Sequence, residues 1–204
     1  FIHYKINKPD TPSENNIDII SLCPDNFGNI WLGTKVDGIY KFNIYLNKFA
    51  NYKNGNPEFF SSGSDNINAI SFIRDSKLLI GTVNGLTIFD FKNNITKTYR
   101  HNENNKNSLH NNLVCSIFKD KSGQIWIGTA NSGFQNFNLE SGLFSTYNIF
   151  ENNKSAKSCS INCITEDNEN NLIISSDIGY DISKFNKSNY ISGIIDYDYK
   201  SSKI

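Results

Sequence analysis

The chain has 204 residues, and its 20 Lys and Arg balance its 20 Asp and Glu, so the formal net charge is zero. This balance excludes the basic surface with which proteins bind nucleic acid or anionic membrane, and no apolar run is long enough to span a bilayer. Aromatic residues make up 13% of the chain, enough for a core, which excludes general disorder. The 33 Asn, against 4 Ala and no Met, favour turns over helices, so composition predicts an all-β fold.

A short apolar stretch recurs along the chain at intervals of 47 or 48 residues. It is preceded by two apolar residues three positions apart and followed by a glycine and an alternating apolar run. Each copy reads as four short strands with polar turns between them, which is typical of a β-propeller blade. The four copies of the stretch are Ile30–Thr34, Leu78–Thr82, Ile125–Thr129 and Leu172–Ser176, and the apolar pairs are Ile19 and Leu22, Ile67 and Ile70, Val114 and Ile117, and Ile161 and Ile164.

In chain order, the first strand of a copy carries the apolar pair, and a turn such as Asp25–Asn29 follows it. The second strand is the recurring stretch, a turn at Asp37 and Gly38 leads to the third, and the fourth carries the aromatic pair Phe49 and Tyr52. Asp25, and likewise Asp120 and Asp167, reads as a turn residue that bonds its own backbone.

Small residues recur in the second strand, and we expect them where neighbouring strands come too close for a larger side chain. They are Gly33, Gly81, Gly128 and Ser175. Trp31 and Trp126 occupy one column of the same strand, where Leu79 and Ile173 replace them. We interpret the Trp residues as filling the wedge between adjacent blades, and the alternative is a stacking platform for a sugar.

The segment from Val114 to Asn138 has the pattern Val-x-x-Ile, Asp-x-x-Gly-x-Ile-Trp-Ile-Gly-Thr and Gly-x-x-x-Phe-Asn. It resembles the two-component regulator propeller repeat. The resemblance implies part of a seven-bladed propeller in the periplasmic sensor region of a hybrid two-component system, of a type that often responds to glycans and carries its histidine kinase elsewhere. Copies one and three match most specifically. Copy two lacks the Asp-x-x-Gly turn, and copy four lacks both the Trp and the Gly-Thr.

The period predicts one propeller fragment. Phe1 and Tyr4 fall in the outer-strand column, which predicts residues 1–14 as the last strand of a missing blade and a linker. Blades then cover residues 15–55, 56–102, 103–150 and 151–197, with a tail at 198–204. We expect four such blades to form an open arc or to pair with a second copy, and a closed four-bladed ring is the alternative.

A ligand is expected at the face shared by the loops between the second and third strands and the long polar segments between blades. The amides of these loops suit an oligosaccharide, although ordinary solvent-exposed loops would have the same composition. The long segments are Asn54–Asn66, with Phe59 and Phe60, Arg100–Asn112 and Asn148–Ser160, and the candidate ligand-binding residues are Lys35, Asp37, Asn84, Asn131 and Asp177.

Nothing in the sequence indicates catalysis, a cofactor or a metal site. His3, His101 and His110 do not recur and read as solvent-exposed loop residues, and the four Cys, which lack metal-ligand spacing, read as mostly buried small residues. The expected partners are an oligosaccharide and the remaining blades, with a homodimer left open and neither nucleic acid nor membrane insertion. The alternative functions are a protein-interaction scaffold and a propeller glycosidase or lyase fragment.

Overall fold

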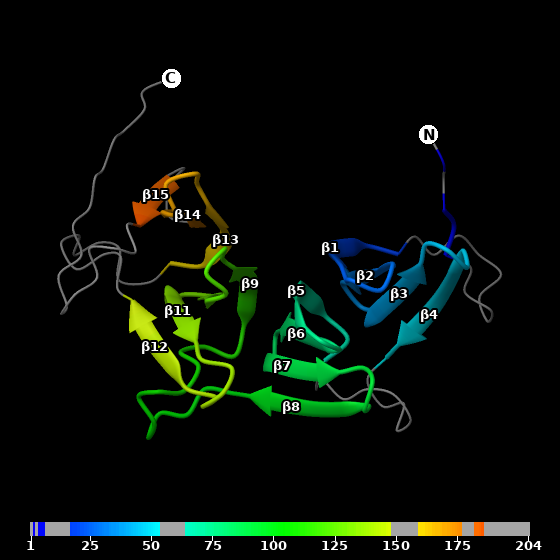
Figure 1. Ribbon diagram of the computed structural model, residues 1–204. Coiled ribbons are helices and arrows are strands. Elements are labelled where there is room, and N and C mark those ends of the chain that lie inside the picture. The colour runs from blue at the N-terminus through cyan, green and yellow to red at the C-terminus, as the bar shows by residue number, and fades with distance from the viewer. Residues whose placement is uncertain are drawn as a thin grey trace.

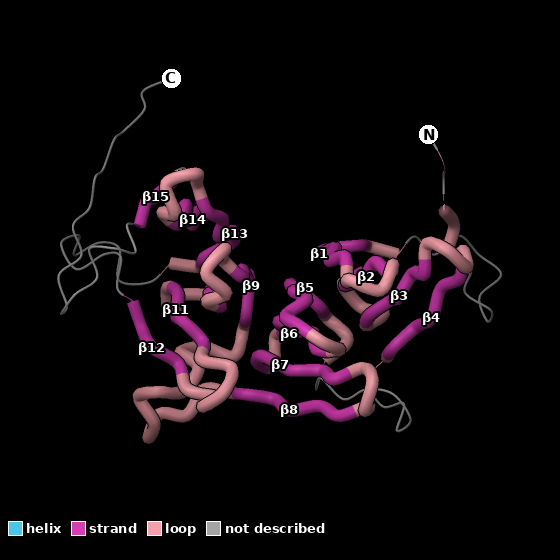
Figure 2. Tube along the Cα trace, in the orientation of Figure 1, coloured by secondary structure: helices cyan, strands magenta, loops and turns pink. Residues whose placement is uncertain are grey.

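The computed structural model describes residues 2, 4–6, 17–53, 64–147, 159–176 and 182–185. The strands in these residues form four antiparallel sheets, and each sheet keeps its strands in sequence order (Figure 1). Figure 2 shows strands and loops, and no helix, in the described part of the chain. The all-β, four-unit architecture that the repeat predicts is therefore confirmed.

Each of the first three blades has four strands, as the residue pattern requires. Blade 1 contains β1 (Ile19–Pro24), β2 (Asn29–Thr34), β3 (Ile39–Asn43) and β4 (Lys48–Tyr52). Blade 2 contains β5 (Ile67–Arg74), β6 (Lys77–Thr82), β7 (Gly85–Asp90) and β8 (Ile95–Tyr99). Blade 3 contains β9 (Val114–Lys119), β10 (Ile125–Thr129), β11 (Phe134–Phe137) and β12 (Phe144–Tyr147). Three described strands make up blade 4: β13 (Ile161–Glu166), β14 (Leu172–Ser176) and β15 (Ile182–Phe185).

The blades follow one another along an open arc, with blade 1 and blade 4 apart at its two ends (Figure 1). The first strand of each blade packs against the preceding blade: β5 on β1 and β2, β9 on β5 and β6, and β13 on β9 and β10. The described residues thus have the open-arc arrangement and not the closed four-bladed ring.

The first strand of every blade contains the same irregularity. The register with the second strand shifts between Ile19 and Ser21, and the same shift recurs at the matching positions of β5, β9 and β13. One extra residue in a strand turns the following side chains to the other face. The bulge therefore explains why apolar residues three apart, such as Ile67 and Ile70, are both buried in one cluster.

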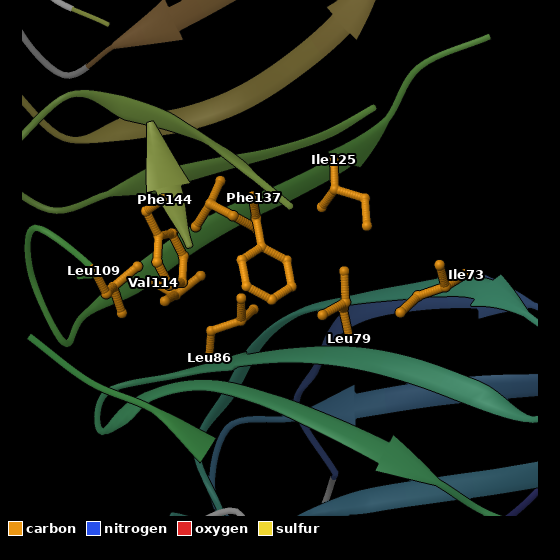
Figure 3. Close-up of a cluster of buried hydrophobic side chains, with 9 residues drawn as sticks. Ile73, Leu79, Leu86, Leu109, Val114, Ile125, Phe137 and Phe144 are labelled. Atoms are coloured by element: carbon orange, nitrogen blue, oxygen red, sulfur yellow. The ribbon is translucent and has the colours of Figure 1, made fainter. Parts of the chain in front are cut away.

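The hydrophobic core lies in the wedges between blades, and each wedge takes residues from both neighbours. Between blades 1 and 2, Trp31 packs edge-on against Phe89, with 6.4 Å between ring centroids. Between blades 3 and 4, Trp126 packs with Ile161 and Leu172. Figure 3 shows the wedge between blades 2 and 3, with nine buried members: Ile73, Leu79, Leu86, Leu109, Val114, Ile125, Ile127, Phe137 and Phe144.

The small residues of the second strands lie directly beneath the first strand of the next blade. A Cβ built on Gly33 would lie 2.7 Å from Cγ2 of Ile67, and one on Gly81 would lie 2.6 Å from Cγ1 of Val114. At Gly128 the neighbour is Ile161, whose Cβ would be 2.8 Å away. The adjacent blade therefore crowds each of these positions, and at Gly33 and Gly128 the hydroxyls of Ser21 and Ser116, from the same blade, come closer still.

Some predictions fall on the ends of the chain and on its longest loops. Residues 2 and 4–6 are not in a strand, and the Tyr4 ring lies 4.7 Å from that of Phe42. Outside the described residues lie Phe1, His3, Phe59 and Phe60, most of the polar segments at 54–66 and 148–160, and the apolar pair Ile191 and Ile194.

Candidate ligand-binding site

The turns of each blade lie at two opposite ends of its strands. At one end, the β2–β3 turn lies beside the segment that leads into the next blade, because the Gly38 amide donates to the carbonyl oxygen of Asp65 at 3.0 Å. Blade 3 repeats this contact. We call this the linker end. At the other, the turn end, the β1–β2 and β3–β4 turns meet, and the Ile44 amide donates to the carbonyl oxygen of Gly28 at 3.0 Å.

A threonine closes each of the first three β2–β3-type turns at the linker end. The Thr34 hydroxyl donates to the carbonyl oxygen of Gly38 at 2.8 Å, and Thr82 and Thr129 bond Gly85 and Gly133 in the same way. All three threonines are fully buried. The Thr of the Gly-Thr pair therefore fixes the turn that presents the candidate ligand-binding residues.

In blade 1 the candidates are Lys35 and Asp37. Lys35 is exposed, and its amide donates to the carbonyl oxygen of Asp18 at 3.0 Å. The Asp37 amide donates to the Thr34 hydroxyl at 2.9 Å, and its carboxylate lies 4.0 Å from the ammonium of Lys53. Both residues are thus held by their backbone, and Lys35 is exposed whereas the Asp37 side chain is only partly exposed.

Blades 2 and 3 each supply one further candidate. Asn84 is exposed, and its carbonyl oxygen accepts a hydrogen bond from Nε of Arg100 at 3.1 Å. Asn131 has a φ of 55°, and its amide donates to the Ser160 hydroxyl at 3.3 Å. Asp177 lies outside the described residues. The four described candidates therefore share the linker end but come from the turns of three different blades.

The segment between blades 2 and 3 is anchored by a polar network that the sequence did not reveal. The side-chain oxygen of Gln135, which is fully buried, accepts from the His110 amide at 2.8 Å. The His110 ring lies 2.9 Å from the Thr146 hydroxyl through Nε2. His110 is half-buried, so the expectation of a solvent-exposed histidine is wrong here, because the segment folds back over blade 3; His101 is exposed.

At the turn end, the repeated aspartate does more than form a turn. Asp25 accepts from the amides of Phe27 and Asn29 at 2.8 and 2.9 Å, and its second oxygen accepts from Nε1 of Trp31 at 2.8 Å. Asp120 accepts from Trp126 Nε1 at 2.9 Å. The recurring Asp and Trp, six residues apart, thus form a bonded pair, a signal that the sequence contained but that pattern matching alone did not explain.

The electrostatics of Asp25 argue against acid catalysis by this carboxylate. Partial burial opposes ionisation of Asp25, but the N–H donors of Asn29, Trp31 and Phe27 outweigh it and hold the pKa of this carboxyl below its ordinary value. A general acid at neutral pH needs the opposite shift. The aspartates therefore serve the turn and the Trp.

The cysteines and acids do not assemble a metal site in the described part of the chain, where no group of three or more candidate ligands occurs. None of the four Cys, all of which lie in the described residues, forms a disulfide. Cys23 and Cys159 are buried and Cys115 is half-buried, whereas Cys163 is exposed and so differs from the expectation of buried thiols. Burial, opposed by a hydrogen bond from the Phe72 amide, raises the pKa of the Cys23 thiol.

Residues 13–35 and 108–131 match the profile of the two component regulator propeller family. These two segments of the chain are thus similar to two component regulator propeller repeats. The matched segments are copies one and three, which carry the Asp-x-x-Gly turn and the Trp, so the resemblance drawn from those residues is confirmed.

Solved structures share the fold of these repeats. One is the extracellular domain of BT4673 from B. thetaiotaomicron, which is named as a one component system in one structure and as a hybrid two component system in another. It is 21% identical over 91% of this chain and 23% of its own, with a TM-score of 0.69. The extracellular domain of BT3049, named as a hybrid two component system of the same organism, is 18% identical over 85% and 29%, with a TM-score of 0.61. The chain thus spans about a quarter of their length.

The computationally designed Ika4 protein is also similar in fold, at 9% identity over 84% of this chain and 91% of that one, with a TM-score of 0.56. Among curated proteins no sequence matches the chain. In the described residues, no helix is long and apolar enough to cross a membrane.

Proposed function

We propose that this chain is a non-catalytic, extracytoplasmic sensor module of a hybrid two-component signalling protein, and that it recognises a glycan-derived ligand at the linker end. The observation that carries the proposal is the match of copies one and three to the two component regulator propeller family. Extracellular domains of B. thetaiotaomicron systems with the same fold support the location and the sensor role.

The linker end supports the choice of a glycan. It presents an exposed ammonium, a carboxylate and amides on turns that buried threonines fix in place. Side chains that both donate and accept, held by a rigid scaffold, suit the hydroxyl groups of a sugar. The ion pair of Asp37 with Lys53 is long, and the Lys53 side chain is 52% exposed against 17% for Asp37, so a ligand that reaches Asp37 displaces an exposed ammonium at little cost.

The test is calorimetric titration of the chain with a panel of neutral oligosaccharides. We expect saturable binding that weakens about tenfold or more in Asp37→Ala and Asn84→Ala, because each loses polar contacts to the ligand. Asn26→Ala, an exposed amide at the turn end, is the matched control and should bind normally.

Two results would contradict the proposal. Capture of a specific protein partner, without any saturable glycan binding, would favour the interaction scaffold. Turnover of a glycan by the purified chain would favour the glycosidase or lyase.

A further inference from the structure

A cleft of about 480 Å³ opens at the turn end, between blades 2 and 3. Blade 2 contributes the end of β5, with Ile73 and Arg74. Blade 3 contributes the end of β9, with Lys119, and the β9–β10 and β11–β12 turns. The volume falls within the roughly 300–1,000 Å³ typical of small-molecule sites. None of the linker-end candidates lines this cleft, so it is a separate site.

The cleft exists because copy two has a shortened turn. Between blades 1 and 2, the four-residue turn at 25–28 of blade 1 places Phe27 edge-on against Phe72 and Phe91, with ring centroids 6.3 and 6.1 Å apart. Blade 2 turns with only Asp75 and Ser76 between β5 and β6, so it projects no such side chain toward blade 3.

The next wedge is also covered. The turn of blade 3 reaches blade 4, where the Lys121 amide donates to the Glu166 carboxylate at 3.0 Å and its ammonium donates to the carbonyl oxygen of Asp167 at 2.9 Å. The departure of copy two from the repeat therefore coincides with an open wedge beside it.

The walls of the cleft carry an excess of positive charge, although the chain as a whole is neutral. Its charged residues are Arg74, Lys119 and Glu140. The Lys119 ammonium donates one hydrogen bond within the described residues, to the carbonyl oxygen of Ile73 at 2.6 Å. An ammonium has three N–H donors, so it can also bond a ligand. The Arg74 guanidinium lies 3.9 Å from the Glu140 carboxylate, and both side chains are more than half exposed.

An exposed, long ion pair contributes little to stability. A carboxylate on a ligand can therefore replace Glu140 beside Arg74 and gain Lys119 as a second partner. An Arg fork and an ammonium on one carboxylate make charge-assisted hydrogen bonds, which are stronger than neutral ones.

The rest of the lining suits a polyhydroxylated ligand. The amides of Gln124, Asn136 and Asn138 line the cleft, and Nδ2 of Asn136 donates to the carbonyl oxygen of Ile125 at 3.2 Å. The apolar floor is formed by Ile73, Ile125 and Phe137, members of the buried cluster between the two blades (Figure 3). Amides for hydroxyl groups, an apolar floor for ring carbons and a pair of cations together match a sugar that carries a carboxylate.

We propose that this cleft binds a sugar acid, with Arg74 and Lys119 holding its carboxylate. The choice of a sugar over other carboxylates rests on the proposed glycan recognition, whereas the anion and the place of binding rest on the cleft itself.

The test titrates the full chain with galacturonate and digalacturonate, beside neutral galactose and the non-sugar carboxylate glutarate. We expect saturable binding of the uronates alone, weakened by added salt because the attraction is between charges. Arg74→Gln and Lys119→Gln should each weaken it by about tenfold, and Glu140→Gln should strengthen it, since it removes the competing carboxylate.

Lys48→Gln is the matched control, because it removes the same charge from an exposed position outside the cleft and outside the linker-end candidates, and it should leave uronate binding unchanged. Glutarate binding as well as galacturonate would overturn the inference, and so would uronate binding that survives in both Arg74→Gln and Lys119→Gln. Galactose binding that these two variants abolish would overturn it as well. Uronate binding without any neutral-glycan binding at the linker end would overturn the linker-end site alone, and the reverse result would overturn the cleft alone.

Discussion

At the scale of single residues, hydrogen bonds between the recurring Asp and the recurring Trp help to maintain the repeat. Asp120 is buried in the β9–β10 turn, where one oxygen accepts from the Gln124 amide at 2.9 Å and the other from the indole N–H of Trp126. A buried indole N–H needs an acceptor. Copy four has Ile173 in place of the Trp, and there Nδ2 of Asn171 donates to the second oxygen of Asp167 at 2.9 Å, as Nδ2 of Asn29 does to Asp25 in copy one.

We therefore expect Asp120→Ala to lower the free energy of unfolding by about 1–3 kcal/mol, because it leaves the Trp126 N–H buried without its acceptor. Asp167→Ala, which removes the same turn residue where no Trp depends on it, is the matched control and should cost less. Urea unfolding followed by Trp fluorescence measures both, and equal losses in the two variants would show that the Asp–Trp bond adds nothing.

Asp90 predicts a dependence of stability on pH. The Ser76 hydroxyl, 2.6 Å away, and donors from Asn93 and Lys92 hold the pKa of this carboxyl at about 2, against about 3.9 in an unfolded chain. A carboxyl with a lowered pKa in the folded state stabilises the fold above its unfolded pKa, and this contribution is lost as the pH falls from about 4 to about 2.

We expect Asp90→Asn to remove this part of the acid dependence. The free energy of unfolding of the variant, measured between pH 5 and pH 2, should fall less steeply than that of the native chain. NMR titration of the Asp90 carboxyl gives the pKa directly. A pKa near the ordinary value of Asp would contradict the assignment.

At the scale of elements, the decisive contact is the first strand of one blade lying on the second strand of the blade before it. The bulge in each first strand brings two apolar residues onto that face, and the small residue beneath gives them room. The bulge residue Asn68 adds a bond between blades, since its Nδ2 donates to the carbonyl oxygen of Val114 at 2.9 Å.

This packing predicts that Gly81→Ala destabilises the chain by about 1–3 kcal/mol through overpacking, because the new Cβ would meet the Val114 side chain. Val114→Ala should make room, so Gly81→Ala should cost less in that background than in the native chain. A double-mutant cycle from urea unfolding measures the coupling, and strictly additive effects would contradict direct contact between the two positions.

At the scale of the whole molecule, the core is divided among the wedges between blades, and a residue's burial depends on whether a blade precedes its own. Ile19 and Ile67 hold the same place in the repeat. Ile67 is fully buried against blade 1, whereas Ile19, at the end of the arc, is 47% exposed.

We accordingly expect Ile67→Ala to lower the free energy of unfolding of the 204-residue chain by about 2–5 kcal/mol, as large-to-small changes in a core do. Ile19→Ala should cost about 0.5 kcal/mol or less, as at an exposed site. Denaturant unfolding of both variants is the measurement, and similar costs at the two positions would mean that Ile19 is covered in solution.

The sequence by itself determined the period, the four strands of a blade, the turns and the resemblance to a propeller repeat, because strand alternation, Gly and Asp turns and the recurring Trp-Ile-Gly-Thr are local features that survive in a single copy. It also placed Lys35, Asp37, Asn84 and Asn131 at one end, since antiparallel strands alternate their turns between two ends. Only the tertiary structure decided which partner each small residue accommodates, how His110 is held, and that a shortened turn at Asp75 leaves a cleft between blades 2 and 3. Those features depend on contacts between residues far apart in the sequence, and no local pattern encodes the distance between two blades.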